Sequence, residues 1–263
     1  MSLNSVLAFG HSHLGALSLA YAQAGGRRDL PYELTTYQFL RSDRPQIINP
    51  DDKGWRYHPE IARDIFALID AIKPQAVVIM MQGEQAVSAG LIAPAKSYDF
   101  YFPHEAGYIP NAASEIISFN LMLKVFITRY QIIADFIDLI RDKFPPLSFA
   151  FSPPPPVGDR QFIIDSNTKH GNIACHIKKN GLPATAWRYR IWKINMMAMR
   201  TVYDARSIAF IDPPDGTAND DGCLRLDFRS DLFHANLAYG ERLLEQIGNL
   251  LAENASALER HET

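Results

Sequence analysis

The sequence has few cysteines, no excess of charge of one sign and no long apolar run. Its two cysteines, Cys175 and Cys223, lie far apart and form no C-x-x-C pattern, which excludes a disulfide framework and indicates a reducing compartment. The 26 Lys and Arg residues nearly balance 29 Asp and Glu, leaving a formal net charge of −3 and a pI near 6.2. This balance argues against a nucleic-acid-binding protein.

The first residues and the apolar segments carry no signal for export or membrane insertion. Residues 14–24 are small and apolar, but no Lys or Arg precedes them and the polar residues 11–13 interrupt the run, so we expect no signal peptide. No segment reaches the roughly eighteen apolar residues that span a bilayer. We therefore expect a cytoplasmic protein without a membrane span, and the sequence carries no indication of its oligomeric state.

Short apolar runs alternate with helical periodicity along the whole chain. Continuous apolar runs are typical of strands buried on both faces of a parallel sheet. They occupy residues 6–9, 34–40, 76–81, 147–151 and 208–211. The helix candidates between them are residues 13–24, 59–72, 115–143, 188–205 and 235–253. This alternation predicts an α/β protein with a flavodoxin-like three-layer α/β/α sandwich, whose central five-stranded parallel sheet has the order 2-1-3-4-5.

We expect residues 1–263 to form a single domain with two long insertions, at about residues 86–114 and 152–187. Long connections in a compact domain are usually lids or binding loops, although packing over the edge of the sheet is the alternative. The first insertion is rich in aromatic residues, including Tyr98 and Tyr101. Aromatic faces can stack on sugar rings, so we assign these two tyrosines to a substrate pocket.

Polar residues that can carry out acyl transfer follow the predicted strands. Ligands bind beyond the carboxyl ends of the strands in an open parallel sheet. Ser12 follows the first strand and opens a helix, which exposes its hydroxyl and points backbone N–H groups at a developing oxyanion. Asp231 lies three residues before His234, close enough to orient its imidazole. The pattern predicts a triad of Ser12, His234 and Asp231, unless Ser12 is only a helix cap and His234 is solvated.

At these residues the chain resembles the SGNH, or GDSL-type, hydrolases. The similarity runs in order from residue 6 to residue 250 and is greatest between Gly222 and Gly240, which includes Asp231-Leu232-Phe233-His234. The family comprises esterases, lipases, deacetylases and some acyltransferases on a flavodoxin-like fold. The resemblance therefore implies acyl transfer through a serine nucleophile, with no metal and no organic cofactor.

Two blocks of the sequence depart from the family pattern. The first reads Gly10-His11-Ser12 instead of Gly-Asp-Ser, and the third reads Gly83-Glu84-Gln85 instead of Gly-x-Asn. The resemblance implies an oxyanion hole made by the Ser12 N–H, a glycine best matched by Gly54, and the amide of Gln85. His11 and His13 flank Ser12, and we assign them to the substrate pocket, although both can be turn residues.

We expect a serine-dependent acyl-ester hydrolase that forms an acyl-Ser12 intermediate. The favoured substrate is a small or glycan-borne ester, such as an O-acylated carbohydrate. Two alternatives stay open: an O-acyltransferase of glycan biosynthesis, and a catalytically silent binding domain on the same fold. The departures at His11 and Gln85 are the reason for the second alternative. The sequence names neither the acyl group nor the leaving alcohol.

Overall fold

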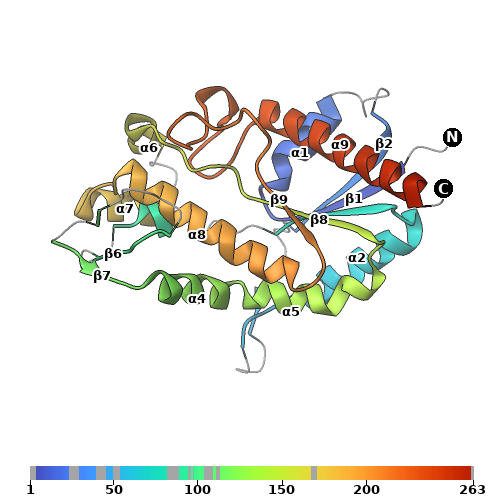
Figure 1. The fold of residues 1–263 in the computed structure, drawn as a ribbon, viewed down its shortest axis with the longest axis horizontal. Helices are drawn as coiled ribbons and strands as arrows, with labels where there is room; N and C mark the ends of the chain where they lie inside the picture. Colours follow the sequence, from blue (N-terminus) through green and yellow to red (C-terminus); the bar gives the residue numbers. More distant parts are fainter. Residues whose placement is uncertain are drawn as a thin grey trace.

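The central element of the computed structural model is a parallel sheet with helices on both faces (Figure 1). The structure describes residues 4–23, 30–39, 46–49, 54–81, 89–93, 96, 98–103, 109–110, 113–166 and 171–261. The five strands of the sheet are β1 (Asn4–Gly10), β2 (Tyr32–Gln38), β5 (Ala76–Met80), β8 (Leu147–Phe151) and β9 (Ala209–Ile211). Their order, β2-β1-β5-β8-β9, confirms the predicted fold class and strand order.

Strand β1 lies inside the sheet, paired in parallel with β2 on one side and with β5 on the other. All five residues of β5 are buried, as its uninterrupted apolar sequence predicts for a strand covered on both faces. Successive side chains of a strand point to opposite faces. Leu7 and Phe9 accordingly belong to one hydrophobic core, whereas Val6 and Ala8 belong to the other.

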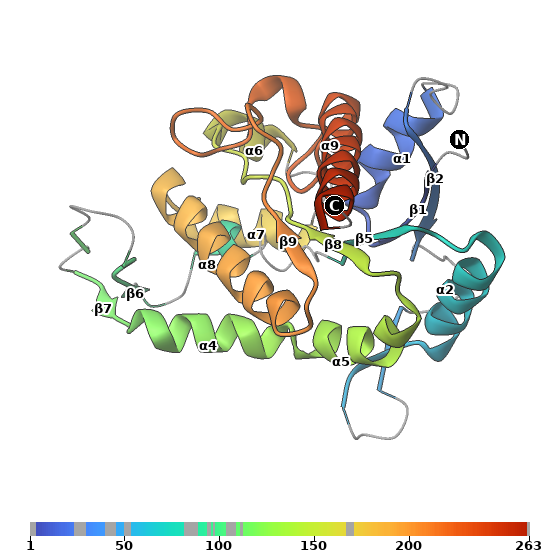
Figure 2. The ribbon, with the colours of Figure 1, turned by 45° about the vertical axis from the view of Figure 1, so that its right-hand side comes forward.

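The two cores are covered by different sets of helices (Figure 2). Helices α1 (Leu14–Gln23) and α9 (Leu237–His261) pack together on one face of the sheet. The opposite face is covered by α2 (Pro59–Ile72), α4 (Phe119–Arg129), α5 (Gln131–Ile140) and α8 (Thr185–Asp204). The result is the predicted sandwich of two helical layers around a sheet.

The helix predicted at residues 59–72 has those bounds in the structure. His58 caps it through an Nδ1 that accepts from the Glu60 N–H, Pro59 occupies its first turn, and Lys73 ends it in the left-handed region with φ 46°.

The helix predicted at residues 115–143 is wrong as one element. It begins at Phe119 and breaks at Tyr130 into α4 and α5, and a short 3-10 turn, η1 (Arg141–Lys143), follows α5. Tyr130 is buried, and its hydroxyl donates to Oδ1 of Asn195 on α8 at 2.9 Å. This contact between distant parts of the sequence fixes the break.

Several of the described residues in the first predicted insertion belong to hydrophobic cores. Strand β6 (Tyr98–Asp99) lies within it and pairs with β7 (Glu115–Ile116), which directly follows it, and Phe100 and Phe102 are buried against α8 and α4. The buried carboxylate of Asp99 lies 3.0 Å from the guanidinium of Arg190 and fastens this segment to α8. Among the aromatic side chains that the structure describes in this insertion, Tyr101 is the one that is largely exposed.

The second insertion contains two helices that the sequence reasoning did not identify, α6 (Arg160–Ser166) and α7 (Gly171–Asn180). Ile163 of α6 and Ile173 of α7 belong to a satellite core, separate from the two main cores, whose other members are Leu91, Val157, Leu182, Leu232 and Phe233. An antiparallel pair, β3 (Ile47–Ile48) and β4 (Arg56–Tyr57), completes the described strands.

Helices α1 and α9 approach each other at a position that only glycine can occupy. A Cβ placed on Gly240 of α9 would lie 2.0 Å from the backbone oxygen of Ala16 on α1. The absence of a side chain therefore sets the distance between these helices, and with it the position of the segment that leads into α9.

We expect Gly240→Ala to lower the free energy of unfolding by about 1–3 kcal/mol or more, because the added methyl group overpacks the contact with α1. Gly248→Ala on the same helix is the matched control, since its Cβ would meet nothing closer than 3.7 Å. That control should be neutral or stabilising by about 0.5–1 kcal/mol, the usual gain in a helix interior. Urea unfolding measures both values, and equal effects would contradict this account of the α1–α9 contact.

Candidate active site

The turn that carries Ser12 is fixed at the carboxyl edge of the sheet. The His11 N–H donates to the Met80 carbonyl at 3.1 Å, and the Phe39 N–H donates to the Gly10 carbonyl at 2.8 Å. A Cβ on Gly10 would lie 2.2 Å from that same Met80 oxygen, so the close approach of the turn to β5 requires glycine. Ser12 is therefore held where the sequence placed it, between β1 and α1.

The start of α1 presents two backbone donors. Within the described residues, the N–H groups of Ser12 and His13 donate no hydrogen bond, whereas those of Leu14 and Gly15 donate to the carbonyls of His11 and Ser12. Such groups at a helix amino terminus attract anions. They are suitable donors for the oxyanion of an acyl-transfer reaction.

Asp231 and His234 form the predicted carboxylate–imidazole pair. Nδ1 of His234 lies 2.9 Å from Oδ2 and 3.0 Å from Oδ1 of Asp231. The backbone N–H groups of Phe233 and His234 both donate to Oδ1 at 2.8 Å. These contacts place the ring proton on Nδ1, which leaves Nε2 as the nitrogen that can accept a proton.

The carboxylate of Asp231 is held in its ionised form. Partial burial favours the neutral acid, but the hydrogen bonds from the His234 side chain and from the two backbone N–H groups outweigh it, so the pKa of Asp231 is well below its usual range. An ionised carboxylate at Nδ1 is the arrangement that stabilises an imidazolium at His234.

His13 links the Ser12 turn to the Asp231–His234 pair. Its ring centroid lies 5.3 Å from that of His234, and His13 directly follows Ser12 in the chain. The Ser12 hydroxyl makes no hydrogen bond within the described part of the chain, so the hydrogen bond from Ser12 to Nε2 of His234 that the triad requires is not formed among these residues. Catalytic hydrogen bonds are often long without substrate and shorten when it binds.

The loop of residues 229–235, which carries Asp231 and His234, is held by contacts at both of its ends and by two buried residues in its middle. Arg229 and Ala235 form an antiparallel bridge at the base, and the Ser230 N–H donates to the His234 carbonyl. Leu232 and Phe233, the two residues between Asp231 and His234, are buried in the satellite core. The position of His234 therefore depends on α6 and α7, which the sequence reasoning missed because that stretch mixes polar and apolar residues.

His11, which replaces the aspartate of the family pattern, has structural partners of its own. Nδ1 of His11 lies 3.0 Å from Oε1 of Gln46, and Nε2 lies 2.8 Å from the Tyr57 hydroxyl. Burial, opposed by the Gln46 hydrogen bond, lowers the pKa of His11 to about 4. An uncharged His11 thus supports the turn from one side, and its assignment to the substrate pocket stays a prediction.

The assignments of Gly54, Gln85, Tyr98 and Tyr101 to the site stay predictions. Gly54 is exposed, and its N–H donates to Oδ1 of Asn49 at 3.1 Å. Gln85, together with Gly83 and Glu84, lies outside the described residues. Tyr98 is half-buried with its ring against Trp187, and Tyr101 is 60% exposed.

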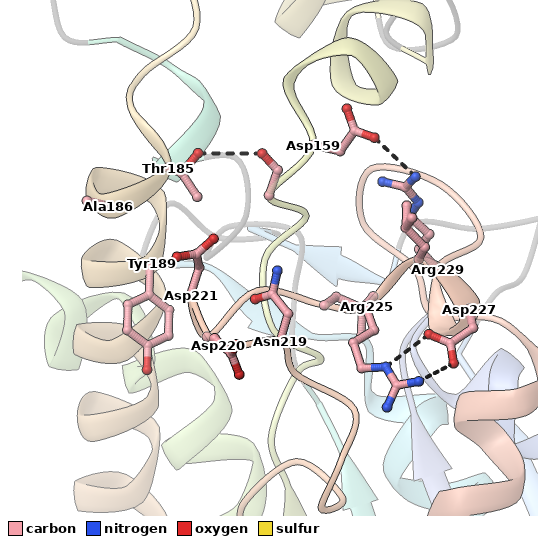
Figure 3. Close-up of a pocket in the computed structure, with 14 residues that line it drawn as sticks. Asp159, Thr185, Ala186, Tyr189, Asn219, Asp220, Asp221, Arg225, Asp227 and Arg229 are labelled. Atoms are coloured by element: carbon pink, nitrogen blue, oxygen red, sulfur yellow. Dashed lines mark hydrogen bonds and ion pairs between the residues drawn. The ribbon is translucent and has the colours of Figure 1, made fainter.

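A groove of about 1250 Å³ lies beside the loop (Figure 3). Its walls come from Gly158 and Asp159, from the start of α8, and from residues 219–229. Asp159 pairs with Arg229, which precedes Asp231 by two residues, and Asp227 pairs with Arg225. Neither Ser12 nor the Asp231–His234 pair lines the groove.

Two further findings concern metals and membranes. Among the described residues, no group of three or more His, Cys, Asp or Glu side chains is arranged to hold a metal ion. No helix in the described part of the chain is both long and apolar enough to cross a bilayer.

No family model matches the sequence, and the search of curated proteins found no match. Solved structures do match. The periplasmic domain of the lipopolysaccharide acetyltransferase of Salmonella ser. Paratyphi A aligns over 95% of this chain and 84% of its own, with a TM-score of 0.54 at 13% identity. A GDSL-like lipase of Bacteroides thetaiotaomicron aligns over 95% and 89%, with a TM-score of 0.49 at 11% identity. At such identities the likeness concerns the fold, and the resemblance read from the sequence is confirmed at that level.

The two histidines that flank Ser12 make stability depend on pH. The pKa of His11 is lowered to about 4 and that of His13 to about 3, from 6.5 for an unperturbed histidine, and burial is the main cause of both shifts. Between pH 6.5 and about 4 the unfolded chain therefore binds more protons than the folded one. We expect the free energy of unfolding to fall as the pH falls through this range, by about 1.4 kcal/mol per pH unit for each histidine.

His13→Phe should remove one of these two contributions, so its unfolding free energy should decline less steeply between pH 6.5 and 4. Urea unfolding at a series of pH values measures the slope. A variant slope equal to that of the wild type would show that His13 is not an uncharged group in the folded protein.

Proposed function

We propose that the chain is a serine-dependent acyl-ester hydrolase that works through an acyl-Ser12 intermediate. The observation that carries the proposal is the Asp231–His234 pair, with contacts of 2.9 and 3.0 Å, located beside the Ser12 turn by the contact with His13. The geometry supplies a base with a fixed tautomer, a hydroxyl at a helix amino terminus and backbone donors next to it. These are the requirements of acyl transfer to serine.

In the first half-reaction, the Ser12 oxygen attacks the ester carbonyl while Nε2 of His234 takes the hydroxyl proton. The Ser12 and His13 N–H groups donate to the oxyanion of the tetrahedral intermediate. The bond from the carbonyl carbon to the alkoxy oxygen then breaks, and His234 returns the proton to the departing alcohol.

In the second half-reaction, a water molecule gives a proton to His234 and attacks the acyl-Ser12 carbonyl. Collapse of the second tetrahedral intermediate releases the carboxylic acid and returns the proton to Ser12. Asp231 stays ionised throughout and stabilises the imidazolium that forms twice in each cycle. The amide of Gln85 remains the predicted further donor to the oxyanion.

The favoured substrate is an O-acylated carbohydrate. The groove beside the loop supports this choice, because it combines the ring of Tyr189 with the amide of Asn219 and the carboxylates of Asp220 and Asp221 (Figure 3). Aromatic rings and hydrogen-bonding side chains of this kind suit a neutral polyhydroxylated ligand. The same groove favours one second candidate, transfer of the acyl group to a glycan hydroxyl instead of water.

A fluorophosphonate probe should label the wild-type protein and fail to label Ser12→Ala, because the probe reacts only with an activated serine hydroxyl. His234→Ala should be labelled at a strongly reduced rate, because the base that accepts the proton is missing. Intact-protein mass spectrometry measures the adduct. A folded wild-type protein that takes up no label would count against acyl-serine chemistry and would favour the silent binding domain.

Asp231→Asn should lower kcat for p-nitrophenyl acetate by a factor on the order of 10⁴ with little change in KM, because an amide cannot hold Nδ1–H and stabilise the imidazolium. Asp142→Asn, at a side chain that is 94% exposed, is the control and should keep wild-type kcat. Steady-state kinetics with both variants checks the expectation. An Asp231→Asn protein with unchanged kcat would exclude Asp231 from the mechanism.

A further inference from the structure

His13 is a buried imidazole that the proposed mechanism uses only through its backbone. The residue is 5% exposed, and neither Nδ1 nor Nε2 has a hydrogen-bond partner within the described residues. Its ring faces that of His234 at a centroid distance of 5.3 Å, with the ring planes inclined by 47°. A polar side chain without a hydrogen-bond partner among the described residues thus lies against the base of the proposed triad.

Packing alone does not explain a histidine at this position. Buried polar side chains are almost always hydrogen-bonded, and an unpartnered one destabilises the fold relative to an apolar group of the same shape. The next inward-facing residues, Leu14 and Leu17, are apolar and fully buried. A phenylalanine would fill the space of the His13 ring without leaving two polar atoms unpaired.

His13 is also unable to replace His234 as the group that accepts a proton. Burial, followed by the neighbouring His234 and His11, lowers the pKa of His13 to about 3, and Asp231 opposes this only in part. His13 is therefore uncharged over the range in which esterases work. A proton that enters this pair of rings during the reaction resides on His234, whose Nδ1 is bonded to Asp231.

We propose that His13 is a positioning residue for His234, an uncharged dipole that stabilises the imidazolium formed when His234 accepts the Ser12 proton. Because neither nitrogen of His13 is bonded to a partner in the part of the chain that the structure describes, its ring proton can reside on either one. The ring can then turn a nitrogen lone pair toward the imidazolium, an interaction that strengthens only as the charge develops. The inference rests on the proposed function and adds a residue to it.

Among the described residues, groups that face His234 come from its own loop and from the turn before α1. Its own loop supplies the ionised carboxylate of Asp231 at Nδ1 and the uncharged ring of Phe233, at a centroid distance of 6.3 Å. The turn before α1 supplies His13, while His11, two residues earlier, is turned toward Gln46 and Tyr57. Replacing His13 therefore changes one neighbour of the imidazolium and leaves the carboxylate in place.

The test compares His13→Phe, His13→Leu and His13→Asn with the wild type. The two apolar variants should raise the thermal unfolding midpoint at pH 7.5, because they remove unpartnered polar atoms, yet lower kcat for p-nitrophenyl acetate about tenfold or more at unchanged KM. The acid limb of the kcat/KM pH profile should move to lower pH, since the imidazolium has lost its dipole. His13→Asn keeps an uncharged dipole and should recover part of kcat.

Gain of stability with loss of kcat is the signature of a functional polar residue. Loss of stability and of kcat together, with the acid limb unmoved, would indicate a packing role and overturn the inference. Wild-type kcat in both apolar variants would overturn it as well, while fluorophosphonate labelling of Ser12 in the same samples would leave the proposed function intact. A folded wild-type protein that is neither labelled nor active would overturn both.

Discussion

The approach of the β1–α1 turn to the end of β5 is the constraint on which the site depends. Gly10 lies so close to the Met80 carbonyl that any side chain would collide with it, and the His11 N–H donates to that same oxygen. Because β1 is paired on both sides, the turn cannot move without disturbing the centre of the sheet. The position of Ser12 and the direction of α1 follow from this contact.

The rest of the site is then placed by packing against α1. Gly240 brings α9 against Ala16, and the loop that ends at the start of α9 brings His234 against His13. The same loop is fastened from the other side by Phe233 in the satellite core. Two independent sets of apolar contacts thus hold a carboxylate–imidazole pair that is itself made by residues only three positions apart.

Structural elements and contacts formed by residues close together in the sequence were predictable, whereas contacts between residues far apart in the sequence were not. The uninterrupted apolar run of β5, the helical periodicity of α2 and the spacing of Asp231 and His234 are all local, and the structure has each of them. The break at Tyr130 and the partners of His11 involve residues 65, 35 and 46 positions away, which no local pattern encodes. Gly54 was matched by its place before the helix at residues 59–72; its N–H donates to Asn49, and its assignment to the oxyanion hole stays a prediction.

The separateness of the satellite core has a consequence for how such a protein can diversify. Its members belong to neither of the main cores, yet two of them, Leu232 and Phe233, stand directly before His234. Substitutions in α6 and α7 can therefore alter the surroundings of the loop that carries Asp231 and His234, while the sheet and its covering helices keep their stability. The residues that maintain the two main cores are therefore distinct from the satellite-core residues that surround the candidate site.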